Sequence, residues 1–354
     1  SGSFTYDASA SIESSAFDFG AALNATEDDG DATLTVVTAD VDDGSTVTLT
    51  LNGQTYTGTV NSDSASIVVA AADLQALTEG TVAYTADVSD SAGNAATQHS
   101  GSFTYDATAP SVATSAFGFD AVLNGTEDDG DATLTVTTSG VEDGNTVTLA
   151  MNGQSYTGTV SSGSASIVVA AADLQALTEG SVAYTADVSD SAGNTATQHS
   201  GTFNYDASAS IASSAFSFGA ALNATEDDGD ATLTVATADV DDGSTVTLTL
   251  NGQSYTGAVS GDSASIVVAA ADLQALTEGS VAYTADVSDS AGNAATQHNG
   301  SFTYDATAPT ISTSVFDFDA ALNATEDDGD ATLTVTISGV EDGNTVTLAM
   351  NGQS

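Results

Sequence analysis

The chain has 354 residues, of which 49 are Asp or Glu and none is Lys or Arg, so its formal net charge is −49. Such a polyanion is repelled by nucleic acids and by anionic membrane surfaces, and this excludes both as partners. Hydrophobic residues make up 41% of the chain, which is enough for packed cores, and there is no Cys to form disulfides. We expect no direct membrane insertion of this segment, because no run of roughly 18 apolar residues occurs.

Alternating apolar and polar residues predict a series of short strands. Taken in chain order, the expected strands cover residues 12–19, 33–38, 46–51, 54–60, 66–70, 82–88 and 101–105. Asn52-Gly53 separates the third and fourth of these strands and is a strong signal for a two-residue hairpin turn. One helical segment is expected, over residues 70–77. About seven short strands joined by turns, with no long helix, predict an antiparallel β-sandwich.

The same pattern recurs along the chain in near-identical repeats. The stretch SASIVVAAADLQALTEG begins without change at Ser64, Ser164 and Ser263, and the FTYDA-type sequence recurs at spacings of 99, 100 and 99 residues. Repeats of about a hundred residues are too long for solenoid turns and suit self-contained domains. We therefore predict the last strand of a preceding repeat over residues 1–6, and then repeats 1 to 4 over residues 7–105, 106–205, 206–304 and 305–354, the fourth being truncated.

Three motifs carry a resemblance to a known family. They are the DLQALTEG turn, the DSAGN loop (90–94 and 190–194) and the YDATAP junction (105–110 and 304–309). With the strands between them, they make essentially the whole chain resemble the bacterial immunoglobulin-like extender repeats of giant RTX-type, biofilm-associated surface adhesins. The glycine-rich nonapeptide repeats of the secretion end of such adhesins are missing. The resemblance implies an all-β fold of tandem immunoglobulin-like antiparallel β-sandwich domains arranged as an extended rod.

The resemblance also implies a function. It indicates a structural spacer, or extender region, that projects a distal binding domain from the cell as a monomeric rod, within an extracellular, outer-membrane-anchored surface protein. The near-identity of the repeats favours this interpretation, since the same task is repeated many times. The alternative is a ligand- or glycan-binding immunoglobulin-like adhesion module. That alternative predicts loop insertions or exposed aromatic clusters in at least one repeat, and the sequence has neither.

Catalytic residues are not expected. There is no G-x-S-x-G motif, and each complete repeat has a single His, at His99, His199 or His298. A metal or acid–base role for these histidines would need a second His or a fixed carboxylate close by, so we interpret them as exposed strand residues. The sequence therefore predicts that the chain is not an enzyme.

The acidic loops are the candidate metal sites. Ca²⁺ takes roughly six to eight oxygen ligands, and the resemblance implies calcium at the junctions between repeats. Alternate loops of such a sandwich lie at opposite ends, so we expect Asp106 to be joined by Asp143, Asp190 and Asn194 of the next repeat. The competing interpretation is that these carboxylates are solvated loop residues that keep a long protein soluble. The candidate ligands are Asp7, Asp106, Asp206, Asp305, Asp143, Asp190, Asn194, Asp242, Asp289, Asn293, Asp342, Asp90, Asn94, Glu27, Glu127 and Glu226. The expected partners are thus calcium ions and the neighbouring repeats of the same chain.

Overall fold

The computed structural model describes residues 6–326 and 328–351, and the chain divides after Asp206 into two compact units. In the first unit, repeat 1 contains β1 (Ser11–Phe17), β2 (Ala22–Leu23), β3 (Ala32–Ala39), β4 (Thr46–Leu51), β5 (Gln54–Thr59), β6 (Ser64–Val69), α1 (Ala71–Leu74), β7 (Gly80–Val88) and β8 (His99–Tyr105). Repeat 2 contains β9 (Ser111–Phe117), β10 (Val122–Leu123), β11 (Ala132–Ser139), β12 (Thr146–Met151), β13 (Gln154–Ser161), β14 (Ser164–Val169), α2 (Ala171–Leu174), β15 (Gly180–Val188) and β16 (His199–Tyr205).

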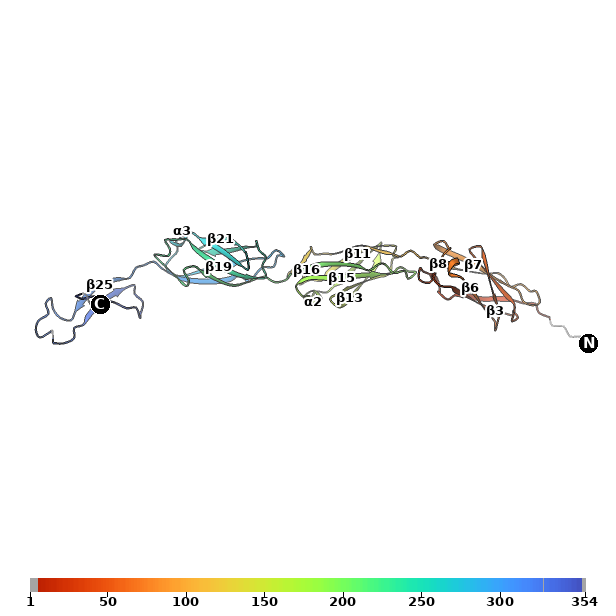
Figure 1. The fold of residues 1–354 in the computed structure, drawn as a ribbon, viewed down its shortest axis with the longest axis horizontal. Helices are drawn as coiled ribbons and strands as arrows, with labels where there is room; N and C mark the ends of the chain where they lie inside the picture. Colours follow the sequence, from red (N-terminus) through yellow and green to blue (C-terminus); the bar gives the residue numbers. More distant parts are fainter. Residues whose placement is uncertain (1–5, 327, 352–354) are drawn as a thin grey trace, which may run out of the picture. The chain divides into compact units, whose positions relative to one another are not determined.

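The second unit repeats this order of elements. Repeat 3 contains β17 (Ser210–Phe216), β18 (Ala221–Asn223), β19 (Ala231–Ala238), β20 (Thr245–Leu250), β21 (Gln253–Ala258), β22 (Ser263–Val268), α3 (Ala270–Leu273), β23 (Gly279–Asp286) and β24 (His298–Asp305). Repeat 4 contributes β25 (Thr310–Phe316) and β26 (Leu333–Ser338), which pair in antiparallel fashion. The colours of Figure 1 follow the strands of each repeat in turn.

Two sheets form each complete repeat. In repeat 1, a three-stranded sheet of order β1-β3-β6 and a five-stranded sheet of order β2-β8-β7-β4-β5 share one hydrophobic core. All their pairings are antiparallel except that of β2 with β8, which is parallel. Repeat 3 has the same two sheets, and in repeat 2 the pairing of β13 with β14 joins them into one eight-stranded sheet. The predicted all-β, immunoglobulin-like sandwich fold is confirmed.

The core follows from the alternation of the strands. In β4, Val47, Leu49 and Leu51 are at most 1% exposed, while the threonines between them point outward. Leu34 and Ile67 of the other sheet, both fully buried, belong to the same core. Burial of each such side chain contributes about 1.5–3 kcal/mol, so the alternation of the sequence alone accounts for much of the stability of a repeat.

Two local predictions were incomplete. The helix covers only Ala71–Leu74 instead of residues 70–77, because Leu74 and Leu77 are both buried and the chain turns between them, with Leu77 N donating to Leu74 O (3.0 Å). The two-residue strand β2 was not predicted, since a two-residue strand has no readable period. The position of β2 beside β8 is nevertheless determined, because Leu23 is fully buried and pairs with Tyr105.

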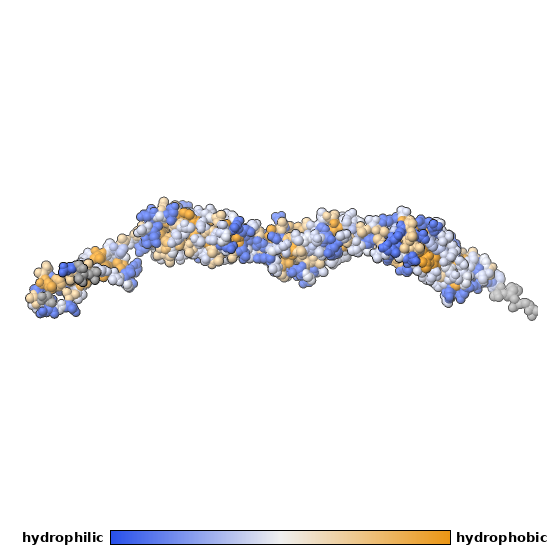
Figure 2. All heavy atoms as spheres, viewed as in Figure 1, coloured by the Kyte–Doolittle hydropathy of each residue, from blue (hydrophilic) through white to orange (hydrophobic). Residues whose placement is uncertain are grey.

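In repeat 1, most charged residues lie outside the strands, and the exceptions are Glu13 in β1 and Asp87 in β7. β3, β4, β5 and β6 contain no charged residue, and their outward positions are mostly Ser and Thr. The carboxylates therefore concentrate in the loops at the two ends of each sandwich. Figure 2 shows this in repeat 3, where hydrophilic residues gather at both ends and the sheet surface between them is mostly pale. We call the end at which the chain begins a repeat the leading end, and the opposite end the trailing end.

Candidate functional site

The DSAGN loop, defined as residues 90–94, 190–194 and 289–293, is closed by its own first and last residues. Asp190 is 6% exposed, and its two carboxylate oxygens accept hydrogen bonds from Asn194 N (2.8 Å) and Asn194 Nδ2 (2.9 Å). Gly193 makes the tight return possible, because its φ of 97° is in the region that favours glycine. The other two loops have the same pair of bonds, between Asp90 and Asn94 and between Asp289 and Asn293. The loop is thus a preformed unit at the leading end.

An acidic turn supports the DSAGN loop from the side. The Asp42 carboxylate accepts hydrogen bonds from both the N–H and the hydroxyl of Ser91, and these bonds lower the pKa of Asp42. Glu142 has the same role in repeat 2, with Oε2 accepting from Ser191 N at 2.8 Å, which lowers the pKa of Glu142. The pKa of Asp90 is lowered too, mainly by its hydrogen bond from the Asn94 amide. The leading end therefore holds its carboxylates ionised by hydrogen bonding rather than by cationic side chains.

The trailing end is built around an Asn-x-Thr-Glu loop. Asn24 Oδ1 accepts from Thr26 N (2.9 Å) and Glu27 N (3.1 Å), and Glu27 Oε2 accepts from Asn24 N (3.1 Å). This reciprocal pattern satisfies the backbone donors of the turn locally. Glu127 and Glu226 make the equivalent bond, to Asn124 N and Asn223 N, at 3.1 Å each. These three glutamates thus shape the loop.

The segment that follows the last strand is tied to the trailing end. Asp106 Oδ1 accepts from Thr108 N (3.1 Å), and Asp106 N donates to Leu23 O (3.0 Å). Glu79, at the end of the DLQALTEG turn, accepts from Ala107 N (3.0 Å) and from the Thr108 hydroxyl (2.7 Å). Asp305, Thr307 and Glu278 repeat these contacts in the second unit. The segments that follow repeats 1 and 3 are therefore each held at the trailing end of their own sandwich.

At the junction of repeats 1 and 2, the DSAGN loop of the later repeat contacts the Asn-x-Thr-Glu loop of the earlier one. Asn194 Oδ1 accepts from Ala25 N (2.9 Å), and Asn194 Nδ2 donates to the carbonyl of Asp106 (2.8 Å). Asn24 Nδ2 donates to the carbonyl of Ala192 (3.0 Å). Of the residues expected to join Asp106 here, Asn194 bonds both the Asp106 carbonyl and Asp190, whereas Asp143 bonds Ser162 N, and a ligand role for these residues stays a prediction.

Solved structures similar to this chain come from bacterial adhesins. One is a Ca²⁺-stabilised adhesin that helps an Antarctic bacterium reach out and bind ice; it is 31% identical, covers 94% of this chain and 84% of its own, and has a TM-score of 0.42. A second, from a 1.5-MDa bacterial ice-binding adhesin, is 27% identical and covers 86% of this chain and 99% of its own, with a TM-score of 0.42. A bacterial immunoglobulin-like domain of the M. primoryensis ice-binding adhesin is 32% identical over 28% of this chain and 99% of its own, with a TM-score of 0.22.

The chain belongs to the bacterial immunoglobulin-like repeats of large adhesins. This assignment rests on sequence identity and coverage, since all three TM-scores are below 0.5. It confirms the resemblance to adhesin extender repeats. No protein-family model matches the chain, and no curated protein matches it.

Other predicted site residues of these immunoglobulin-like repeats are spread over both ends. The Asp7 carbonyl accepts from Asn94 Nδ2 (3.1 Å), and Asp206 N donates to Leu123 O (3.0 Å). Asp143 and Asp242 accept from Ser162 N (2.6 Å) and Gly261 N (2.8 Å), in the turn after the fifth strand of their repeats. Asp342 lies exposed in a turn of repeat 4. In the acidic turns Asp42-Asp43 and Glu142-Asp143, it is therefore the first residue that supports the DSAGN loop.

Some residues of the adhesin junction were missed from the sequence. Asn24 and Ala25 contact the next repeat directly, and Glu79 holds the linker. The Asn-x-Thr-Glu spacing was the available signal, because an Asn followed three residues later by Glu is typical of a self-capped turn. His99, His199 and His298 were expected to be exposed, but all three are half-buried, and His199 Nε2 lies 2.8 Å from Ser115 Oγ.

The oxygen atoms at the junction of these adhesin repeats are of the kinds that calcium prefers as ligands. They are carboxylate, amide and backbone carbonyl oxygens, which suit a hard cation. Over residues 6–326 and 328–351, however, no three Asp, Glu, His or Cys side chains lie close enough together to hold one metal ion. A cation there would therefore depend on carbonyl and amide oxygens as well as on carboxylates. Within the same residues, no helix is long and apolar enough to cross a lipid bilayer.

Proposed function

We propose that this chain is a structural spacer, the extender region of a large bacterial cell-surface adhesin, which projects a distal binding domain away from the cell. The contact between repeats 1 and 2 carries this proposal, because the linker and both facing loops are held by hydrogen bonds that involve residues recurring in each complete repeat. Each sandwich adds about 40 Å of reach, since strands of about eight residues rise about 3.3 Å per residue and loops extend both ends.

The same proposal treats residues 7–105, 106–205 and 206–304 as separate domains of an extracellular, monomeric rod. Because all 49 charged side chains of the chain are carboxylates, neighbouring rods meet without complementary charge and repel one another. We assign the chain no catalytic role, because its loops repeat with little change and are used for contacts within and between the repeats.

Calcium at the junctions is part of this proposal. The Asp106 and Asp190 carboxylates and the Asp106 carbonyl surround the contact between repeats 1 and 2, and Glu27 stands on the facing loop. A divalent cation there would neutralise carboxylates that no Lys or Arg can pair with, and would oppose bending of the linker. A similar adhesin is described as Ca²⁺-stabilised, which supports the same assignment.

Small-angle X-ray scattering in millimolar Ca²⁺ and then in chelator, at fixed ionic strength, tests this proposal. We expect the maximum dimension to fall, or the profile to become that of a flexible chain, when calcium is removed. Asp106→Asn should lower the number of bound calcium ions measured by isothermal titration calorimetry, whereas Asp143→Asn, at a carboxylate bound to Ser162 N, should not. Identical extended profiles in both buffers would disprove the calcium sites, and a compact globule in both would disprove the spacer.

A further inference from the structure

We propose that repeats 1 and 2 are joined by a direct amide clasp, with Asn194 as its central residue, which acts in addition to any cation at the junction. The DSAGN loop of one repeat is the inserted part, and the Asn-x-Thr-Glu loop and linker of the preceding repeat form its socket. This inference rests on the proposed spacer function for its biological meaning, but it assigns the junction a second means of cohesion besides calcium.

The side-chain amide of Asn194 is fully used by protein partners. Its Oδ1 accepts from Ala25 N of repeat 1, and its Nδ2 donates both to the Asp106 carbonyl and to Asp190 Oδ2. If Oδ1 and Nδ2 were exchanged, Nδ2 would face the Ala25 N–H donor, and Oδ1 would face the acceptor oxygens of Asp106 and Asp190. The orientation of the amide is therefore determined. Asn194 is 6% exposed, and hydrogen bonds at such a buried position are little weakened by water.

The fit of the two loops adds to these bonds. A Cβ atom at Gly193 would lie 3.1 Å from Asn24 Nδ2, so the absence of a side chain lets the socket approach the loop closely. Asn24 Nδ2 donates to the Ala192 carbonyl next to it. An uncharged amide clasp also suits a chain without Lys or Arg, because amides donate hydrogen bonds without bringing further carboxylates together.

The inserted loop has the same form where no preceding repeat is described. In repeat 1, Asn94 N and Nδ2 donate to the Asp90 carboxylate at 2.7 and 2.6 Å, and Nδ2 also donates to the Asp7 carbonyl at 3.1 Å. These are the bonds that Asn194 makes to Asp190 and to Asp106. The internal bonds of the loop are therefore the same in repeats 1 and 2.

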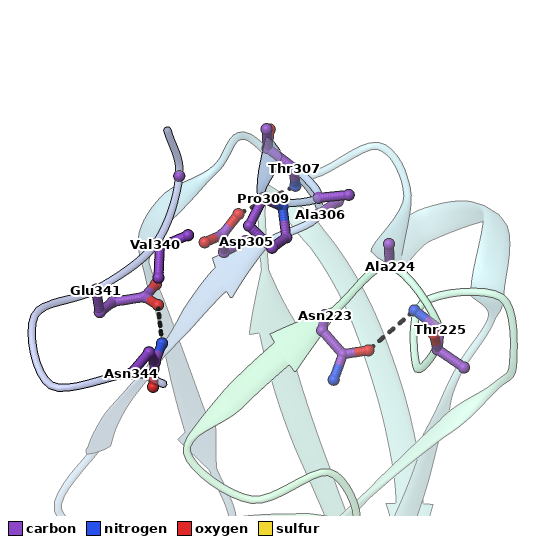
Figure 3. A pocket seen from close by; sticks show the side chains of 12 residues that line it. Asn223, Ala224, Thr225, Asp305, Ala306, Thr307, Pro309, Val340, Glu341 and Asn344 are labelled. Carbon is purple, nitrogen blue, oxygen red and sulfur yellow. Dashed lines mark hydrogen bonds between the residues drawn. The ribbon is translucent and has the colours of Figure 1, made fainter. Parts of the chain in front are cut away.

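The corresponding residues of repeats 3 and 4 also lie around one site. A cavity of about 400 Å³ there is lined by Asn223, Ala224, Asp305, Glu341 and Asn344 (Figure 3). By sequence these residues correspond to Asn24, Ala25 and Asp106 of repeat 1 and to Glu142 and Asn145 of repeat 2. In the first unit, all five bond residues of the segment 189–194.

Asn223 Oδ1 accepts from Thr225 N (2.9 Å), and Asp305 Oδ1 accepts from Thr307 N (3.0 Å). Asn24 and Asp106 make the equivalent bonds in the first unit.

The Asn194→Asp variant distinguishes a role of Asn194 in the clasp from a role as a metal ligand. The carboxylate would keep an oxygen ligand and add charge for Ca²⁺, but it would lose both amide donors and stand beside Asp190. Asn94→Asp is the matched control, because it changes the same bonds inside the loop of repeat 1 without touching the junction of repeats 1 and 2. Asn24→Asp tests the socket side, since it keeps the Oδ1 acceptor of the turn and removes the donor to Ala192.

The chain has no Cys, so spin labels can be placed on Thr55→Cys and Ser155→Cys, at exposed positions of equivalent strands of repeats 1 and 2. We would measure the distance distribution between them by double electron–electron resonance in the full chain with chelator present. In chelator, the distribution for the parent and for Asn94→Asp should be at most half as wide as that for Asn194→Asp and Asn24→Asp, while circular dichroism still shows folded repeats, and Ca²⁺ should narrow all four further. Distributions of equal width for the parent and Asn194→Asp in chelator would overturn the clasp. If Ca²⁺ changes nothing while the parent is narrow, the calcium part of the proposed function fails and the clasp stands.

Discussion

One tyrosine at the end of the last strand ties each complete repeat to its acidic loop. Tyr105 OH donates to Asp28 Oδ2 at 2.6 Å, and both side chains are about 5% exposed. Tyr205 with Asp128 and Tyr304 with Asp227 repeat the bond at the same length. A buried carboxylate without a cationic partner needs such donors, and this explains why the position is Tyr rather than Phe.

These tyrosines predict a loss of stability in alkali. The hydrogen bond to Asp28 and burial raise the pKa of Tyr105 to about 12, and the Tyr205 and Tyr304 hydroxyls are raised to about 12 by the same causes. Because an unfolded tyrosine titrates near about pH 10, this contribution is fully present below that pH and is lost as the pH rises through about 12. Urea unfolding from pH 8 upward should show the decline. In a variant with Phe at all three positions, the decline should be smaller and the stability at pH 8 lower; an unchanged profile would contradict the assignment.

At the scale of elements, one glycine decides how the two sheets meet at the β5–β6 corner. A Cβ at Gly58 would lie 2.6 Å from the Ser66 carbonyl oxygen and 2.8 Å from Ile67 Cγ1. Gly158 and Gly257 meet the corresponding atoms of β14 and β22 at similar distances. The fifth strand can therefore lie directly on the sixth only where the side chain is absent, and this contact closes one side of the sandwich.

Gly58→Ala should destabilise repeat 1 by about 1–3 kcal/mol, because the methyl group forces backbone rather than a flexible side chain to move. The control is Gly30→Ala, where the nearest atom to the new Cβ is Glu27 O at 3.9 Å. Its effect should stay within about 0.5 kcal/mol. The midpoint of the first urea transition of the full chain measures both, and equal midpoints for the two variants would disprove the close contact.

For the molecule as a whole, the lack of Lys and Arg means that added salt screens repulsion between carboxylates and weakens no Lys or Arg salt bridge. There are 49 carboxylates and no Lys or Arg salt bridge for salt to weaken. Raising the ionic strength shortens the Debye length from about 30 Å at 0.01 M to about 3 Å at 1 M, which screens repulsion between the carboxylates.

We expect the Tm to rise steadily with NaCl at pH 7, in chelator so that calcium has no part. At about pH 3, where most carboxylates are protonated, the rise should be much smaller. A Tm that falls with salt at pH 7, or that rises equally at both pH values, would show that carboxylate repulsion is not the cause.

The fold could be predicted from the sequence because its signals are local and repeated. The strand predicted over residues 46–51 has the observed bounds of β4, and the Asn52-Gly53 turn joins β4 to β5 with the positive φ angles that it requires. Strand ends elsewhere moved by one or two residues: pairing with neighbours extends β3, β7 and β8 beyond their own pattern, whereas β1, β5 and β6 end earlier than predicted. The hydroxyls of Thr38, Thr138 and Thr237, buried and without a hydrogen-bond partner among the described residues, follow the inward period of their strands although they are polar.

The sequence by itself determined the repeat length, the sandwich class and the acidic ends, and it led to the expectation that Asp106 meets Asp143, Asp190 and Asn194. Only the tertiary structure decided which atoms meet there. It placed Glu142 rather than Asp143 beside the DSAGN loop, and it turned the Asn194 amide toward Ala25 and Asp106. The physical reason is range: alternation and turn chemistry act over a few neighbouring residues, whereas the junction joins residues 168 or 169 positions apart, whose meeting depends on the packing of two whole sandwiches.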